Sequence, residues 1–177
     1  MCPNLSLLRS YKVYPRKIDF NYMRDRFFIY VYLDPFKELT KPLQVTAGPK
    51  EICFGYEPFY IGKGTGSGYR QHQHLKEFLD KREINRYKIE KLAEIENNMA
   101  KAAAKGDISK PWNWEEYQKE WIIIIDTFEN SRALVNFELE LINKIGTRFD
   151  NSGPLTNKIK RQSKFDYILK TGNGQLI

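Results

Sequence analysis

The chain is poor in cysteine and in long apolar runs. Its 177 residues include two cysteines, Cys2 and Cys53, and two histidines. Without a C-x-x-C pair, neither a zinc ribbon nor a disulfide framework is expected, and two isolated thiols fit a reducing compartment. The longest apolar run, 121–125, is as short as a strand and far below the length that spans a membrane. The N-terminus also lacks the apolar region of a signal peptide, so we expect a cytoplasmic protein.

The glycines of 59–74 do not form either of the common nucleotide-binding loops. A Walker A loop needs G-x-x-x-x-G-K-[ST], and Lys63 comes too early for it. In the dinucleotide fingerprint G-x-G-x-x-G, the third glycine would fall on Ser67 or Tyr69. Both kinds of nucleotide site are therefore excluded.

Positive charge is in excess. The chain has 29 Lys and Arg against 22 Asp and Glu, a formal net charge of +7, and a pI near 9.3. This balance favours a polyanionic partner such as DNA. The length suits one domain, which we assign to 27–157, between a basic N-terminal extension (1–26) and a basic C-terminal tail (158–177).

Hydrophobic patterning predicts an α/β (α+β) domain with a small, mainly antiparallel three-stranded sheet and flanking helices. The first strand is expected at 27–33 and ends at Asp34-Pro35, before a long excursion over 36–50. The second, 51–62, is interrupted near Glu57-Pro58 and forms a hairpin with the first. The third, 121–127, does not alternate at 122–125 and is expected to be buried on both faces.

Helical periodicity is predicted over three segments. The first runs from Tyr69 to Asp80 and the second from about Arg82 to Lys105, followed by a loop over 106–114. The last has Ser131 as its candidate cap and is stopped by Gly146.

The residues that follow the second strand suit a phosphodiester. Arg70 and His74 are four apart and share one face of a helix. The glycines before them let backbone approach an anion, Arg70 can grip a phosphate, and His74 or Tyr60 can move a proton. His72 lies on another face and is expected to be exposed.

Several separated motifs together resemble the GIY-YIG nuclease family. Tyr30-Val31-Tyr32 stands where the family has Gly-Ile-Tyr, and Tyr60-Ile61-Gly62 matches its second signature. The remaining matches are the Arg-x-x-x-His spacing of Arg70 and His74, the metal-binding stretch beginning at Glu138, and the closing Asn157. The resemblance covers about 27–157 and is closest to the phage-encoded and homing-type branch.

The resemblance implies a DNA endonuclease that depends on Mg²⁺ or Mn²⁺. Glu138 would hold the metal, whereas Glu140, about 200° round the same helix, would face solvent. The implied catalytic set is Tyr32, Tyr60, Arg70, His74, Glu138 and Asn157, and the implied DNA contacts are Lys63, Arg70, Lys158, Lys160 and Arg161. Tyr30, at the glycine position, is given no chemical role. The general base stays open among Tyr32, Tyr60 and His74.

Two other functions remain open. One is a non-catalytic nucleic-acid-binding module on the same scaffold, although it would leave the Arg, His, Glu and Asn of the catalytic set without a purpose. The other is a hydrolase for a different phosphate-bearing substrate. A polymer is favoured over a small substrate by the basic charge.

Overall fold

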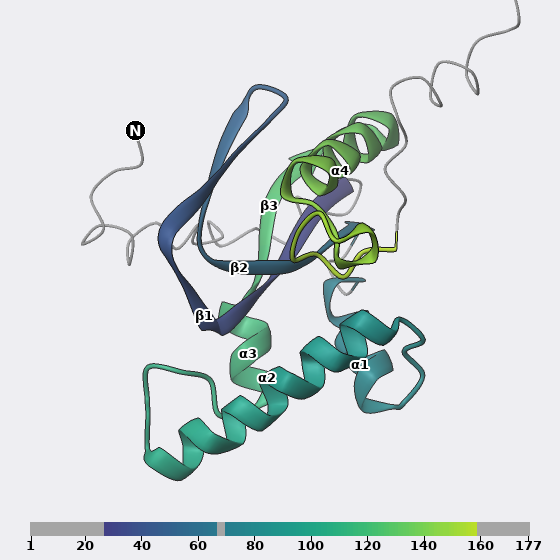
Figure 1. The fold of residues 1–177 in the computed structure, drawn as a ribbon. Coiled ribbons are helices and arrows are strands. Elements are labelled where there is room, and N and C mark those ends of the chain that lie inside the picture. Colours follow the sequence, from purple (N-terminus) through teal and green to yellow (C-terminus); the bar gives the residue numbers. More distant parts are fainter. Residues whose placement is uncertain (1–26, 67–69, 159–177) are drawn as a thin grey trace, which may run out of the picture.

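A computed structural model describes residues 27–66 and 70–158, which form an α+β domain (Figure 1). Three antiparallel strands make one sheet in the order β2-β1-β3. They are β1 (Phe27–Ala47), β2 (Lys50–Thr65) and β3 (Ile122–Phe128). The predicted fold class is confirmed, and the first strand along the chain is the central one.

The excursion predicted over 36–50 is wrong, because that segment is strand except for the turn at 48–49. β1 continues through Asp34-Pro35 to Ala47, and β2 starts at Lys50, so the two form one long hairpin. The polar and proline residues are absorbed by register shifts after Tyr32, Leu33 and Glu38. Such irregularities let a strand bend without ending. The interruption predicted near Pro58 is confirmed, since the pairing skips a residue there.

The expectation that the third strand is buried on both faces is also wrong. β3 lies at an edge of the sheet, and in it only Ile122 is buried, while the following residues are half-buried. A continuous apolar run is typical of a central strand, but here the central position belongs to β1. Residues 28–34 of β1 are buried throughout.

Four helices accompany the sheet: α1 (Arg70–Leu79), α2 (Arg86–Lys105), α3 (Trp114–Glu120) and α4 (Ser131–Ile145). α1 and α4 confirm the predictions, and Gly146 ends α4. The N-cap of α4 is Asn130 rather than Ser131, because the Asn130 side chain accepts the Ala133 N–H. Helix α2 begins later than predicted, after the cap Asn85, and α3 was not predicted.

The helices do not share the sheet equally. α4 packs across all three strands, whereas α1, α2 and α3 each meet mainly one strand, respectively β2, β1 and β3 (Figure 1). Between α2 and β1 the fully buried Lys91 forms an ion pair of 2.5 Å with the fully buried Asp34. In the part of the chain that the structure describes, no helix combines the length and apolarity needed to cross a membrane.

Candidate active site

The hairpin register places the two signature segments opposite each other. Tyr30 pairs with Gly62, Val31 with Ile61, and Tyr32 with Tyr60. Side chains alternate along a strand, so the three tyrosines share one face of the sheet. Their ring centroids are 6.0 Å apart for Tyr30–Tyr32, 5.6 Å for Tyr32–Tyr60 and 6.3 Å for Tyr30–Tyr60. We call these three residues the tyrosine cluster.

Gly62 makes room for this cluster. A Cβ at position 62 would lie 2.3 Å from Cζ of Tyr30 and 2.4 Å from its hydroxyl. Both distances are well below van der Waals contact, so a side chain at position 62 would displace the Tyr30 ring. Glycine at position 62 is therefore required by the close packing of Tyr30 opposite it.

The three hydroxyl groups of the cluster have different surroundings. The Tyr32 hydroxyl donates to the backbone carbonyl of Gln71, and the side chain is fully buried. The half-buried Tyr60 places its hydroxyl 2.8 Å from Nε2 of His74. The Tyr30 hydroxyl is buried and has no hydrogen-bond partner among the described residues. Tyr60, which alone of the three is partly exposed, is thus the one suited to exchange a proton with a substrate water.

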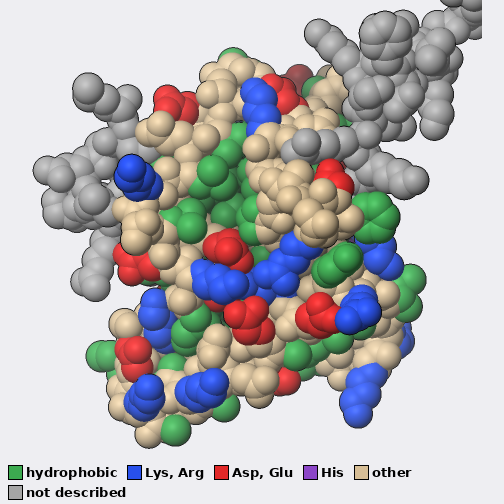
Figure 2. Space-filling view, viewed as in Figure 1, with side chains coloured by type: hydrophobic (Ala, Val, Ile, Leu, Met, Phe, Trp, Pro, Cys, Tyr) green, Lys and Arg blue, Asp and Glu red, His purple; other side chains and the backbone are tan. Residues whose placement is uncertain are grey.

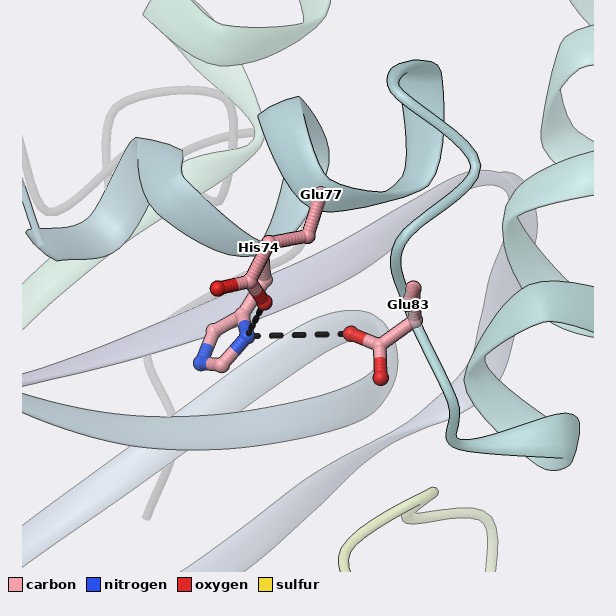
Figure 3. A group of neighbouring side chains, drawn as sticks. All are labelled: His74, Glu77 and Glu83. Carbon is pink, nitrogen blue, oxygen red and sulfur yellow. Dashed lines mark hydrogen bonds and ion pairs between the residues drawn. The ribbon is translucent and has the colours of Figure 1, made fainter.

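His74 is held from both sides of its ring. Its Nδ1 lies 3.2 Å from Oε2 of Glu77 and 3.7 Å from Oε2 of Glu83, and Figure 3 shows both carboxylates directed at this one nitrogen. Ionised carboxylates only accept hydrogen bonds, so Nδ1 carries the proton and Nε2 is left to accept the Tyr60 proton. Burial and the Lys88 ammonium lower the pKa of His74, against the opposing effect of the two glutamates. At neutral pH His74 is therefore an uncharged acceptor.

The same three residues do not fit a metal ion. Both oxygens of Glu83 already have partners: Oε1 accepts the backbone N–H groups of Ile84 and Asn85, and Oε2 lies 3.0 Å from Nζ of Lys88. Lys88 also lies 4.0 Å from the centroid of the Tyr60 ring. A bound cation would have to displace this ammonium. The group orients the imidazole instead.

Glu138 is a better fit to a cation. The carboxylate comes from the buried face of α4, and its Oε2 is 2.6 Å from Nζ of Lys63 on β2. The Glu138 side chain is 6% exposed and the Lys63 side chain 44%, so this ion pair is open to solvent on the lysine side. Mg²⁺ keeps several water ligands and commonly uses one or two carboxylates. A cation at Glu138 would have to displace the Lys63 ammonium, but Lys63 is 44% exposed and can turn to solvent, whereas Lys88 at Glu83 is 4% exposed.

Arg70 and Glu138 have opposite electrostatic effects on the hydroxyl groups of Tyr30 and Tyr60. Arg70 is the first residue of α1, is exposed, and donates to Oε1 of Gln73 at 2.9 Å. Burial raises the pKa of Tyr30 and of Tyr60 far above the usual range; in both, Glu138 adds to the rise and Arg70 opposes it. Both tyrosines therefore stay protonated unless a partner removes the proton.

A groove of about 760 Å³ is lined in part by Lys63 and Arg70. It lies between the end of β2, helix α1 and the first turns of α4. Its polar lining includes Lys63, Arg70, His72, Lys76 and Ser131. His72, expected to be exposed, is instead half-buried in this lining. The groove presents cationic side chains, and of the predicted catalytic set only Arg70 lines it.

Asn157 lies beneath the site rather than in it. Its Oδ1 accepts the Ile61 N–H at 3.0 Å, and its Nδ2 donates to the Ile61 carbonyl at 2.7 Å. The side chain is buried, and both ends of its amide are used by this one backbone position. Asn157 thus fixes the edge strand β2 between Tyr60 and Gly62, and its contacts are those of a positioning residue.

Three of the five residues predicted to contact DNA lie within the described part of the chain. Lys63 and Arg70 lie at the site, and Lys158 is exposed, with Nζ 3.4 Å from the Ile84 carbonyl. Lys160 and Arg161 lie outside the described residues. Within 27–66 and 70–158 there are 19 Lys and Arg and 19 Asp and Glu, so the whole net charge of +7 belongs to 1–26 and 159–177. On the face shown in Figure 2, acidic and basic side chains accordingly lie side by side.

Sequence reasoning missed the two glutamates beside His74 and the cluster's unpaired hydroxyl. Glu77 follows His74 by three residues on a helix, a spacing that brings side chains together and could have identified it. Glu83 lies beyond the end of α1, and no local pattern places it there. Tyr30 was set aside because it occupies a glycine position, and only the packing over Gly62 reveals where its hydroxyl lies.

Comparisons with known proteins found no match: no protein-family model, no curated protein and no solved structure matches this chain.

Proposed function

We propose that this protein is a metal-dependent endonuclease that hydrolyses phosphodiester bonds in DNA. The observation that carries the proposal is the contact between Tyr60 and His74 next to Arg70, Lys63 and Glu138. A proton acceptor, two cations for a phosphate and one cation-binding carboxylate are the groups that this reaction needs.

The Tyr60–His74 pair supplies the base. A water molecule attacks phosphorus and gives a proton to the Tyr60 oxygen, while Tyr60 passes its own proton to Nε2 of His74. The new P–O bond forms as the bond to the leaving oxygen breaks, and that oxygen takes a proton from solvent. Neither residue acts well alone, because burial raises the pKa of Tyr60 and the hydroxyl needs an acceptor. Glu77 and Glu83 stabilise the imidazolium that results.

Charge on the phosphate is balanced by the cationic groups of the groove. Arg70 can bind two phosphate oxygens with its planar guanidinium, and Lys63 supplies a point charge. Glu138 would hold the Mg²⁺, which when bound polarises a phosphate oxygen and lowers the pKa of bound water. Lys63 then moves from the carboxylate to the substrate phosphate.

Cleavage of plasmid DNA with and without Mg²⁺ tests the proposal directly. Wild type should cut with Mg²⁺ and should not cut in EDTA. Glu138→Gln should abolish cutting while DNA affinity in EDTA stays at the wild-type value, because glutamine keeps the shape and loses the charge. Arg70→Ala should lose cutting and some affinity together, since it contacts phosphate in the ground and transition states alike.

Glu140→Gln is the matched control on the same helix and should cut like wild type. If Glu138→Gln also cuts at the wild-type rate in Mg²⁺, the proposed mechanism is wrong. DNA binding with no cutting by wild type would instead support the non-catalytic nucleic-acid-binding module.

A further inference from the structure

Tyr30 stands out because its buried hydroxyl has no hydrogen-bond partner within 27–66 and 70–158. A hydroxyl sealed from water without a hydrogen bond costs free energy, and native proteins keep few of them. The other two members of the tyrosine cluster each satisfy their hydroxyl, on the Gln71 carbonyl and on His74. The same strands could carry phenylalanine at position 30, as they do at Phe28. A functional reason for the hydroxyl should therefore be sought.

The Tyr30 hydroxyl lies beside Tyr60. Its ring crosses from the central strand over Gly62, two residues along β2 from Tyr60 and on the same face. The Tyr60 hydroxyl is close enough to lower the pKa of Tyr30, although the two groups do not meet hydrogen-bond geometry. In this state Tyr60 donates its proton to His74 and has an oxygen lone pair to spare.

We propose that Tyr30 is a positioning residue for the reaction, whose hydroxyl donates to the Tyr60 oxygen as that oxygen gives up its proton to His74. The inference rests on the function proposed above. No substrate contact is required, which agrees with the complete burial of Tyr30. A donor placed in advance where negative charge develops stabilises that charge without reorganisation.

The remaining surroundings of Tyr60 do not supply this donor. Lys88 lies over the face of the ring, while Arg70 and Lys63 line the groove and donate to Gln73 and Glu138 respectively. Burial is the largest cause of the raised pKa of Tyr60, and the negative charges of an ionised Tyr30, of Glu138 and of Glu83 raise it further, so Tyr30 can favour ionisation of Tyr60 only as a neutral donor. Because burial keeps Tyr30 itself protonated, it acts as a donor and not as a base.

Tyr30→Phe removes only the hydroxyl and tests the inference. We expect kcat for DNA cleavage to fall about ten- to a hundredfold, the effect of one hydrogen bond to a charged group. KM and DNA affinity in EDTA should stay within about twofold, because Tyr30 touches no substrate. The melting temperature should equal or exceed that of wild type, since an unsatisfied buried group is removed.

Two controls separate this role from a structural one. Tyr117→Phe, which removes a buried hydroxyl that donates to the Leu33 carbonyl at 2.9 Å, should lower the melting temperature and leave cleavage unchanged. In a Tyr60→Phe background, Tyr30→Phe should cost no further activity, because a residue that acts through Tyr60 has nothing left to act on.

Provided that wild type cuts DNA and Glu138→Gln does not, three outcomes would overturn the inference. They are cleavage by Tyr30→Phe at the wild-type rate, a joint loss of cleavage, DNA affinity and melting temperature, and an additive loss in the Tyr60→Phe background. A wild-type protein that cuts no DNA would overturn the proposed function and this inference together.

Discussion

Two lysine–carboxylate pairs flank the sheet, and they differ in their access to water. Lys91 and Asp34 are both fully buried, and Glu57 adds a second carboxylate 3.0 Å from the same ammonium. Lys63 is 44% exposed while its partner Glu138 is 6% exposed. Neither member of the first pair can reach solvent without opening the core. The second can release its lysine to solvent or to a phosphate, which makes it the pair suited to function.

The sealed pair joins the middle of the hairpin to α2. Asp34 follows the signature tyrosines on β1, and its Oδ1 also accepts the Phe36 N–H at 2.9 Å. Lys91 comes from α2 and reaches Glu57 on β2, so one ammonium joins two strands and a helix. Burial alone would lower the pKa of Lys91, but Asp34 and Glu57 raise it on balance. The cation therefore persists in the core.

The largest effect is expected from Lys91→Met, which leaves Asp34 buried without a counter-charge. Removing one partner of a buried ion pair destabilises proteins by about 3–5 kcal/mol. Urea denaturation should show a loss of this size in the free energy of unfolding. A change below about 1 kcal/mol would mean that Asp34 does not depend on Lys91.

Lys63→Met should have a smaller effect on folding and a clear effect on cleavage. The pair is open on one side, so we expect a loss of about 1–2 kcal/mol in unfolding free energy, between the values for surface and buried pairs. Cleavage should fall about a hundredfold, the usual cost of removing one group that stabilises transition-state charge. If the loss of stability matched that of Lys91→Met, the two pairs would not differ as proposed.

Glu140→Gln should have the smallest effect and extends the comparison to an exposed pair. Glu140 was expected only to face solvent. In fact it accepts the Gly48 N–H at 2.9 Å and pairs with Lys144 at 2.8 Å, so it ties the hairpin tip to α4. Exposed pairs contribute about 0–1 kcal/mol. Unfolding free energy should change within that range, and a larger loss would make the hairpin tip a structural element of the domain.

Prediction from sequence succeeded where local patterns dominate. The aromatic first strand, the helix at Arg70 and the stop at Gly146 all follow from propensities and capping that involve neighbours in the chain. It failed where neighbours in space decide. Residues 36–50 contain Pro42 and Gly48 and look like a loop, yet they extend β1 and the hairpin turn because a facing strand and α4 support them.

The candidate site divides in the same way. Spacing along one helix predicted His74 rather than His72, and His74 is the histidine that contacts Tyr60. The sequence also predicted roles in phosphate chemistry for Tyr60, Arg70 and Glu138, and these stay predictions. The sequence could not predict the hydrogen-bond partner of each tyrosine hydroxyl, because Tyr30, Tyr32 and Tyr60 are the same residue type on the same face of the sheet. Their separate partners depend on α1, Gly62 and His74.

The sequence by itself determined the type of most elements, though not of 36–50 or α3, together with the charge excess and the inventory of reactive side chains, because these depend on composition and on contacts within a few residues. Only the tertiary structure decided that Lys91 is buried while Lys63 is open to solvent, and that Tyr60 is the tyrosine whose hydroxyl contacts His74. Burial and hydrogen bonding are set by segments far apart in the chain: 75 residues separate Lys63 from Glu138, and 57 separate Asp34 from Lys91. No local pattern encodes such distances, so the packing of α2 and α4 on the hairpin determines them.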